Sequence, residues 1–154
     1  MNEPFRTSVE IAAAPETVFP YLTRPEAIVR WMGDYAVLDP RADGEFTLDI
    51  NGIPVRGRYL EVDPPHRLVI SWGHAGSALL PPGSSTVEIT LSPIPTGTLV
   101  SLEHRDLPPE EADKHAVGWP HFLARLAIAA TGSDPGLDPF ATQTRSQTNK
   151  GRSE

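Results

Sequence analysis

The histidines are the side chains of this chain best suited to acid–base chemistry or metal binding. None forms a known metal-ligand spacing with a neighbour, and His115 and His121, six residues apart, face different sides of a helix. We therefore expect no metal site. The sequence contains no phosphate loop, dinucleotide fingerprint or Ser-His-Asp set, so we expect no cofactor and assign no catalytic residue. The histidines are His66, His74, His104, His115 and His121.

His104 is the histidine whose position supports a specific hypothesis. It ends a predicted strand over residues 98–105, where alternation puts it on the inward face with Val100 and Leu102. A neutral imidazole there could hydrogen-bond a ligand carbonyl or act as a base. The alternative is a histidine bonded to the backbone at the rim of the sheet, and the sequence leaves both interpretations open.

Glu61 is the acidic residue that could assist such a histidine. It lies in an otherwise apolar predicted strand over residues 55–62. If it points inward beside Tyr59 it is a candidate acid, and His104 with Glu61 or Tyr59 would form the convergent polar pair that an enzyme needs. The alternative is a solvated glutamate at the edge of the sheet.

The three tryptophans each lie on the apolar side of their predicted element. As core residues they need no further explanation, and as pocket walls they would give a flat apolar ligand a surface for stacking. Few charges accompany the other residues predicted to face inward. The sequence therefore predicts that a ligand contacts Trp31, Phe46, Tyr59, Trp72, Leu102, His104, Trp119 and Phe122.

A long helix over residues 109–131 is the element that must position several of these side chains. Its apolar residues recur at alternating four- and three-residue steps, which puts them on one face. Pro120 cannot donate to the carbonyl of Ala116, and Gly118 weakens the same turn. We therefore expect a kink near 116–120, or two helical pieces meeting there. The predicted face consists of Ala112, Ala116, Trp119, Leu123, Leu126 and Ala130.

The segments before this helix predict one sheet and two short helices. A strand at residues 5–12 is followed by helices at 15–22 and 25–31. Asn51-Gly52 is a strong hairpin signal between two of the later strands. An antiparallel meander with one apolar face needs a cover, so we predict an α+β fold in which a curved sheet wraps around the long helix and leaves a space. The later strands are predicted at 35–38, 44–50, 55–62, 67–72, 85–92 and 98–105.

Two segments lie outside this regular pattern. In the loop 73–83, Leu79 and Leu80 have no periodic partner. We expect this loop to be a lid whose leucines close the cavity mouth or contact another subunit, as in a homodimer. Residues 133–154 are polar and lack apolar periodicity, so we interpret them as a tail that follows a single domain at 1–132.

Length and composition limit the classes of partner. The 154 residues suffice for one domain with a substantial core. A formal net charge of −7, with no run of Lys or Arg before the tail, argues against nucleic acid as a partner. The chain has no cysteine, no apolar stretch approaching about 18 residues, and no basic-then-apolar order at its N-terminus. We therefore expect a cytoplasmic protein without a membrane span.

Residues 9–32 read Val-Glu-Ile-Ala-Ala-Ala-Pro-Glu-Thr-Val-Phe-Pro-Tyr-Leu-Thr-Arg-Pro-Glu-Ala-Ile-Val-Arg-Trp-Met. This stretch, with several later ones, resembles the SRPBCC superfamily, which includes START and birch-pollen-allergen-like domains. Residues 9–32 are similar to the opening of that superfamily. Gly-Arg-Tyr-Leu-Glu-Val-Asp-Pro-Pro-His-Arg-Leu-Val-Ile-Ser-Trp at 57–72 resembles its activator-of-heat-shock-protein-90-ATPase-homologue family. The similarity covers about residues 5–132 in the expected order. The same family resemblance extends to residues 85–91, 97–104 and 118–119.

The resemblance implies a helix-grip fold with a cavity between the sheet and the long helix. It implies no single activity, because relatives include lipid binders, polyketide cyclases, hydrolases and co-chaperone domains. The favoured hypothesis is a non-enzymatic carrier or sensor of a small hydrophobic molecule held in that cavity. The alternatives are a cyclase- or hydrolase-type enzyme on an aromatic or polyketide-like substrate, and a co-chaperone-like interaction module.

Overall fold

The computed structural model describes residues 4–136 and 138, which form one antiparallel sheet with helices against it. The chain begins with β1 (Phe5–Ile11), followed by α1 (Pro15–Val18), the 3-10 helix η1 (Phe19–Leu22) and α2 (Pro25–Ile28). The long helix α3 (Pro109–Ala130) comes last. The strands between them are β2 (Tyr35–Leu38), β3 (Glu45–Ile50), β4 (Ile53–Asp63), β5 (Arg67–Trp72), β6 (Ser85–Ile94) and β7 (Gly97–Arg105).

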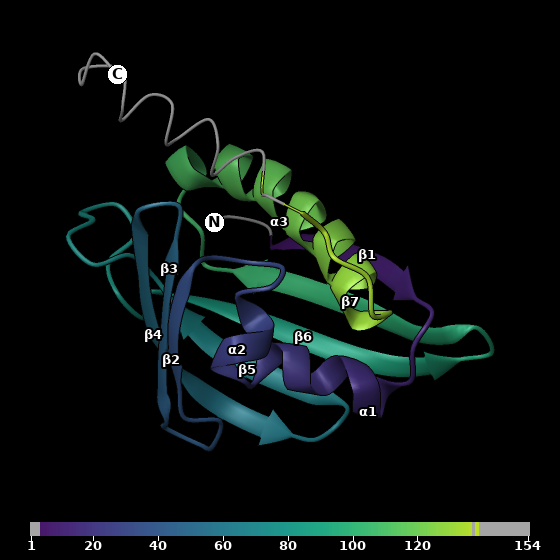
Figure 1. Cartoon of the computed structure of the whole chain (residues 1–154). Coiled ribbons are helices and arrows are strands. Elements are labelled where there is room, and N and C mark those ends of the chain that lie inside the picture. Colours follow the sequence, from purple (N-terminus) through teal and green to yellow (C-terminus); the bar gives the residue numbers. More distant parts are fainter. Residues whose placement is uncertain (1–3, 137, 139–154) are drawn as a thin grey trace, which may run out of the picture.

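The sheet has seven strands in the order β1-β7-β6-β5-β4-β3-β2, and every neighbouring pair is antiparallel. Figure 1 shows α3 lying over the curved sheet, and α3 packs against the edge strand β1. The short helix α1 packs against β6 and β7, and α2 against β2. The predicted α+β arrangement, with a curved sheet, a covering C-terminal helix and short helices after the first strand, is confirmed.

The short helices differ in detail from the prediction. The single helix predicted at 15–22 is an α-helical turn followed by a 3-10 turn. Pro20 has no N–H to continue the α pattern, and the chain tightens until the N–H of Thr23 donates to the Pro20 carbonyl at 3.2 Å. The second helix ends at Ile28, before the predicted Trp31, because the N–H groups of Arg30 and Trp31 donate to carbonyls three residues earlier instead of four.

The hairpin of β3 and β4 is the one that Asn51-Gly52 predicts. Asn51 has a φ of 52° and Gly52 a φ of 86°, both in the left-handed region. Ile50 pairs directly with Ile53 across the turn. Positive φ at both central positions is the two-residue geometry that matches the right-handed twist of the flanking strands. The hairpin therefore holds a fixed register.

The helix α3 runs without interruption from Pro109 to Ala130, so the expectation of two separate pieces is wrong. Pro120 lies on the exposed side of the helix, where water can bond the Ala116 carbonyl that it leaves free. A bend at this point stays a prediction. The buried residues of α3 are Glu111, Trp119, Phe122, Leu123, Leu126, Ala129 and Ala130.

The inner face of the sheet forms the core, as the alternation predicts. Along β7, and along β6 as far as Leu91, every second side chain is buried, and the residues between them are partly exposed. Each large apolar side chain buried in this way contributes about 1.5–3 kcal/mol relative to leaving it in water. The buried series is Ser85, Val87, Ile89 and Leu91 on β6, with Thr98, Val100, Leu102 and His104 on β7.

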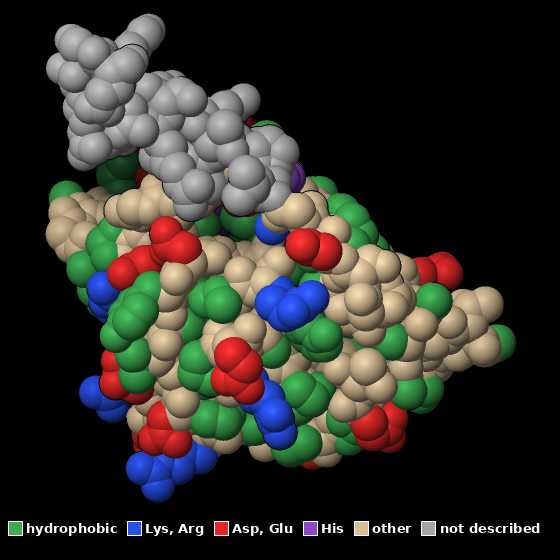
Figure 2. All heavy atoms as spheres, viewed as in Figure 1, with side chains coloured by type: hydrophobic (Ala, Val, Ile, Leu, Met, Phe, Trp, Pro, Cys, Tyr) green, Lys and Arg blue, Asp and Glu red, His purple; other side chains and the backbone are tan. Residues whose placement is uncertain are grey.

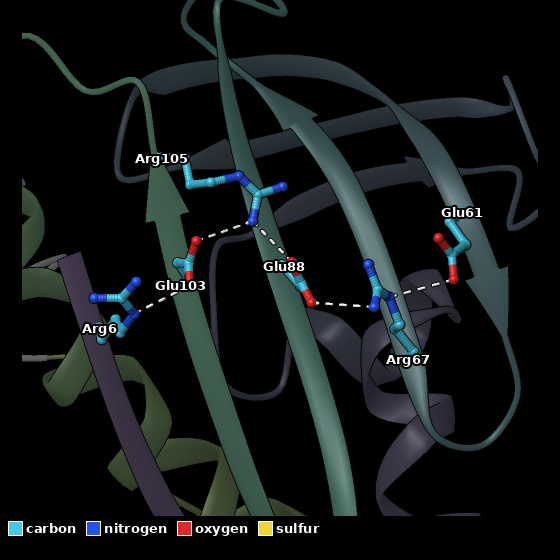
Figure 3. Close-up of polar contacts among 6 residues, drawn as sticks. All are labelled: Arg6, Glu61, Arg67, Glu88, Glu103 and Arg105. Atoms are coloured by element: carbon cyan, nitrogen blue, oxygen red, sulfur yellow. Dashed lines mark hydrogen bonds and ion pairs between the residues drawn. The ribbon is translucent and has the colours of Figure 1, made fainter. Parts of the chain in front are cut away.

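The outer face of the same strands carries a chain of alternating charges that crosses β1, β7, β6, β5 and β4 (Figure 3). We call it the charge ladder. Its central member, Arg105, contacts Glu88 at 2.7 Å and Glu103 at 3.1 Å through Nη1. Glu88 also lies 3.3 Å from Nη1 of Arg67. The full ladder is Arg6, Glu103, Arg105, Glu88, Arg67 and Glu61.

Glu61 therefore points away from the core, and the interpretation of an inward acid beside Tyr59 is wrong. The register between β4 and β5 shifts between Tyr59 and Glu61. Such a bulge inserts one residue and reverses the alternation, so Tyr59 faces the core while Glu61 faces outward. There Glu61 lies 3.2 Å from Nε of Arg67 and is largely solvated. The predicted pair of His104 and Glu61 lies on opposite faces of the sheet.

On the face shown in Figure 2, acidic and basic side chains are interspersed among apolar ones, and neither sign gathers into a single patch. Within residues 4–136 and 138, no helix is both long enough and apolar enough to cross a membrane.

Candidate ligand-binding site

A cavity of about 190 Å³ lies between the N-terminal half of α3 and the β3–β4 hairpin. Most of its lining is apolar. The polar groups come from α3, from the loop after β5 and from Asn51 at the turn of the hairpin. The lining residues are Met32, Ile50, Asn51, Ile53, Val55, Trp72, His74, Glu111, Lys114, His115, Gly118, Trp119 and Phe122.

Three of the residues predicted to contact a ligand line this cavity, namely Trp72, Trp119 and Phe122. The rings of Trp72 and Trp119 lie 5.1 Å apart at 54°, and Phe46 packs behind Trp72 at 5.7 Å. Tilted aromatic contacts of this kind stabilise one another beyond the area they bury. Trp72 and Trp119 thus form one wall of the cavity, with Phe46 behind it. A ligand contact by these side chains stays a prediction.

The other predicted residues are buried in the core and are not part of the lining. The indole N–H of Trp31 donates to the Tyr21 carbonyl at 2.9 Å. The hydroxyl of Tyr59 donates to the Leu22 carbonyl at 3.1 Å. Burial, and secondly the charge of Asp39, raise the pKa of Tyr59 well above its usual range. The core residues of the predicted set are Trp31, Phe46, Tyr59, Leu102 and His104.

His104 is held by side chains at both ring nitrogens. The indole N–H of Trp119 donates to its Nδ1 at 3.0 Å. Its Nε2 lies 2.8 Å from Oγ of Ser85, and that hydroxyl donates to the Trp72 carbonyl at 2.7 Å. Because Ser85 has only one hydrogen to give, it accepts from His104, which fixes the neutral Nε2–H tautomer.

This arrangement differs from the predicted backbone-bonded histidine, and a ligand contact by His104 stays a prediction. Both of its ring nitrogens bond to side chains, those of Trp119 and Ser85, and neither bonds to the backbone. Burial, followed by the nearby rings of His115 and His74, lowers the pKa of His104 to about 2. His104 is a positioning residue that fixes the orientation of Trp119 in the cavity wall.

The polar side of the cavity consists of residues that were not predicted. The rings of His74 and His115 stack with their centroids 6.0 Å apart and an angle of 14° between planes. Nδ1 of His115 donates to the carbonyl of Glu111 at 2.9 Å. The Glu111 side chain is 8% exposed and lies 3.5 Å from Nζ of Lys114. Burial, and then the neighbouring His115, lower the pKa of His74.

The spacing of the polar lining residues along α3 is a sequence signal that could have predicted them. Glu111, His115, Gly118 and Phe122 follow one another at steps of four, three and four, and this stripe lies beside the predicted apolar one. Two of its members are polar and one is glycine, so a search for apolar periodicity passes over it. The face of α3 that meets the sheet is therefore rotated slightly about the helix axis from the predicted face. Ala112, which belongs to the predicted face, is only partly buried.

The two ends of the loop between β5 and β6 approach each other closely at Gly73. A Cβ at this position would lie 1.9 Å from the Pro81 carbonyl oxygen, so only glycine fits. The N–H of His74 donates to the Leu80 carbonyl at 2.7 Å. Leu80 is fully buried, whereas Leu79 is 51% exposed. For Leu80 both predicted roles are wrong, because it belongs to the core. The lid function of the loop stays a prediction.

The segment after α3 also reaches this part of the molecule. A carboxylate oxygen of Asp138 lies 2.7 Å from Nε2 of His121, and the other accepts from the Asn51 amide at 3.3 Å. Arg125 donates to the carbonyls of Pro135 and Gly136. Among the residues that the structure describes, no group of three His, Cys, Asp or Glu side chains could hold a metal ion.

The curved antiparallel sheet, the covering C-terminal helix and the space between them define a helix-grip protein of the SRPBCC type. The sequence pattern of the family described as "Activator of Hsp90 ATPase homolog 1-like protein" matches residues 12–131. Because this match spans most of the chain, the protein belongs to that family. No functionally curated protein sequence matches it.

Solved structures agree with this assignment. The AHSA1-like protein RHE_CH02687 from Rhizobium etli is 44% identical, with 91% of this chain and 90% of that chain covered and a TM-score of 0.70. Protein MLL2253 from Mesorhizobium loti is 25% identical, with 86% and 99% covered and a TM-score of 0.75. The Aha1 dimer from Colwellia psychrerythraea is 18% identical, with 84% and 96% covered and a TM-score of 0.73, and it shows the fold alone.

Proposed function

We propose that this protein binds a small hydrophobic molecule in the cavity between α3 and the β3–β4 hairpin, as a carrier or sensor. The observation that carries the proposal is the cavity of about 190 Å³, walled by Trp72, Trp119 and Phe122. Largely apolar cavities with a few polar groups are typical of small-molecule sites. As expected from the sequence, we place this function in the cytoplasm.

The volume of the cavity limits the size of the ligand. An apolar cavity of about 150 Å³ accommodates benzene, and pockets for drug-sized ligands measure about 300–1,000 Å³. A space of about 190 Å³ therefore suits one aromatic ring with a short substituent. Sterols and long fatty acids do not fit unless the helix moves.

Tryptophan fluorescence tests this proposal directly, because two of the three tryptophans line the cavity. The protein is titrated with benzene, toluene and naphthalene, and separately with palmitate and cholesterol. We expect saturable changes in emission with the one-ring compounds and weaker or no changes with the large lipids. The driving force is burial of apolar surface, about 25 cal/mol per Å², reduced by the entropy cost of association.

A blocking variant supplies the control. A Cβ added at Gly118 meets no atom within 4 Å, and Gly118 lines the cavity. Gly118→Phe should therefore fill the space and abolish the titration. Val117→Phe places the same ring on an adjacent residue that is 63% exposed, and it should bind like the wild type. Absence of binding for every compound, or equal binding in Gly118→Phe, would contradict the proposal.

One observation favours an additional role in self-association. Leu79 is 51% exposed on the loop after β5, as the alternative of an interaction surface predicts. A structural neighbour of the same fold is a dimer. We propose that Leu79 contributes to a homodimer contact. Sedimentation equilibrium of the wild type and Leu79→Ser tests this, with a dimer that Leu79→Ser weakens as the expected result and a wild-type monomer as the contrary one.

A further inference from the structure

The lining of the cavity changes in character from its floor to its mouth. At the floor, Trp72 and Trp119 are each 3% exposed and Val55 is 1% exposed. At the mouth, His115 is partly exposed and Lys114 is exposed. A molecule whose apolar part rests on the floor therefore has its other end beside the stacked imidazole rings of His74 and His115.

The hydrogen bond of His115 determines what its ring can offer. A carbonyl oxygen can only accept, so the contact with the Glu111 carbonyl places a hydrogen on Nδ1 of His115. In the neutral ring the lone pair then lies on Nε2. Within the part of the chain that the structure describes, Nε2 of His115 has no hydrogen-bond partner. In His104, by contrast, both nitrogens are occupied.

The charges at the mouth select against an ionic ligand. The carboxylate of Glu111 is nearly buried and would repel an anion, and the ammonium of Lys114, 3.5 Å away, would repel a cation. Together these two groups leave the mouth close to neutral. The unused group that His115 presents at the mouth is therefore a hydrogen-bond acceptor, in surroundings that favour an uncharged donor. Deeper in the lining, the buried indole N–H of Trp72 is a donor with no hydrogen-bond partner among the described residues.

We infer that the ligand of this cavity is a compact aromatic molecule with one uncharged hydroxyl or N–H group, which donates a hydrogen bond to Nε2 of His115. The inference rests on the proposed function and names its ligand class, that of simple phenols and aromatic amines. The ring occupies the apolar floor, and the polar hydrogen lies at the mouth.

Five probes of similar size test the inference by calorimetric titration of the full chain at about pH 8, where an ordinary imidazole is neutral. Phenol and aniline have the required donor, toluene and anisole lack it, and benzoate is an anion. We expect phenol and aniline to bind roughly 3–10-fold more tightly than toluene and anisole, the range for one neutral hydrogen bond. Benzoate should bind most weakly.

Variants then locate the acceptor. His115→Phe keeps a ring but removes Nε2, so the advantage of phenol over toluene should disappear while toluene still binds. If His115→Phe does not fold, His115→Ala removes the same acceptor without adding apolar bulk. His66→Phe is the matched control, because His66 lies outside the cavity lining and should leave the advantage of phenol unchanged.

The possible results separate this inference from the proposed function. Equal binding of phenol and toluene to the wild type overturns the inference and leaves the proposed function standing. Absence of binding by all five probes overturns the proposed function itself. Tightest binding by benzoate, or a phenol advantage that survives in His115→Phe, overturns the assignment of His115 Nε2 as the acceptor.

Discussion

The two halves of α3 meet the same sheet in different ways. The C-terminal half buries Leu123, Leu126 and Ala129, each 2% exposed or less, and packs along β1. The N-terminal half stands above a cavity of about 190 Å³ and turns Glu111 and His115 toward it. One half of the helix stabilises the fold, and the other leaves a space that a ligand can occupy.

The difference arises from the types of residue at corresponding positions. Leucine and alanine at helical spacing fill the closed half to the density of a protein interior. In the open half the same spacing holds Glu111, His115 and Gly118, which are polar or have no side chain to pack. Trp119 lies at the boundary, where it forms a wall of the cavity and bonds to His104. Substitutions in the C-terminal half should therefore change mainly the free energy of unfolding, and substitutions in the N-terminal half should change mainly ligand affinity.

The largest effect is expected at that boundary. Trp119→Ala should lower the free energy of unfolding by about 3–5 kcal/mol, because it leaves a void and an unpaired His104. It should also abolish ligand binding. Leu126→Ala, in the closed half, should cost about 2–5 kcal/mol and leave binding unchanged. Denaturant unfolding and ligand titration measure the two quantities, and a cost below about 1 kcal/mol for Trp119→Ala would contradict its burial.

A pair of smaller substitutions isolates the hydrogen bond. The indole N–H of Trp119 has an acceptor in His104, whereas that of Trp72 is buried with no hydrogen-bond partner among the described residues. Trp119→Phe leaves Nδ1 of His104 without its hydrogen-bond donor, whereas Trp72→Phe removes no hydrogen bond among the described residues. Trp119→Phe should therefore be the more destabilising of the two by about 1–3 kcal/mol. Equal costs in chemical denaturation would mean that the bond to His104 contributes nothing measurable.

The neutral state of His104 makes stability depend on pH. Its pKa in the folded protein is about 2, below the ordinary 6.5, so the unfolded chain binds the extra proton first. Stability is thus complete above about pH 6.5 and falls as the pH decreases. The loss by about pH 5 amounts to roughly 2 kcal/mol, and the lowered pKa of His74 acts in the same direction.

Unfolding curves of the wild type and His104→Gln between about pH 7.5 and 5 test this dependence, because the variant lacks the titrating group. At the upper end of this pH range His104→Gln should be less stable than the wild type, because the hydrogen bonds to Ser85 and Trp119 are disturbed. Its stability should, however, change less with pH. An equally steep dependence in both proteins would assign the effect to other groups.

These features differ in how far the sequence could predict them. The strands follow from a period of two, and the β3–β4 hairpin follows from Asn51-Gly52. The aromatic wall was partly predicted, since Trp72 and Trp119 lie on apolar sides of their elements. The bulge that turns Glu61 outward leaves no local signal, because an inserted residue looks like any other strand residue.

The position of the cavity depends on a rotation of α3 that apolar periodicity fixes only coarsely. The stripe of Glu111, His115 and Gly118 faces the sheet, although its composition is typical of a solvated face. The bonding of His104 was equally hidden, because Ser85 and Trp119 approach it from elements distant in the sequence. Such contacts depend on how β6, β7 and α3 come together, which no local pattern encodes.

Replacing either of two glycines by alanine should change the stability of the protein in opposite directions. One glycine lies beside the cavity in the N-terminal half of α3, and the other follows the C-terminal half. Gly118 is helical and an added Cβ meets open space, so Gly118→Ala should raise stability by about 1 kcal/mol and weaken binding slightly. Gly132, just after α3, has a φ of 90°, so Gly132→Ala should lower stability by about 1 kcal/mol without affecting binding. Thermal unfolding checks both, and a stabilising Gly132→Ala would contradict the backbone geometry.

The smallest effect is expected on the outer face of the sheet, in the charge ladder (Figure 3). Glu88 contacts both Arg105 and Arg67, but these side chains are 24%, 34% and 40% exposed. Ion pairs as exposed as these contribute about 0.2–1 kcal/mol each, so Glu88→Gln should cost about 1 kcal/mol or less. The cost should shrink further in about 1 M salt, where the screening length falls to about 3 Å.

Glu10→Gln provides the matched control, because it makes the same change in charge on the exposed side of β1 without an ion pair among the described residues. It should alter stability less than Glu88→Gln in low salt. Ligand affinity should remain that of the wild type in both variants, since the ladder and the cavity lie on opposite faces of the sheet. A weaker affinity in Glu88→Gln alone would show that the outer charges hold the curvature on which the cavity depends.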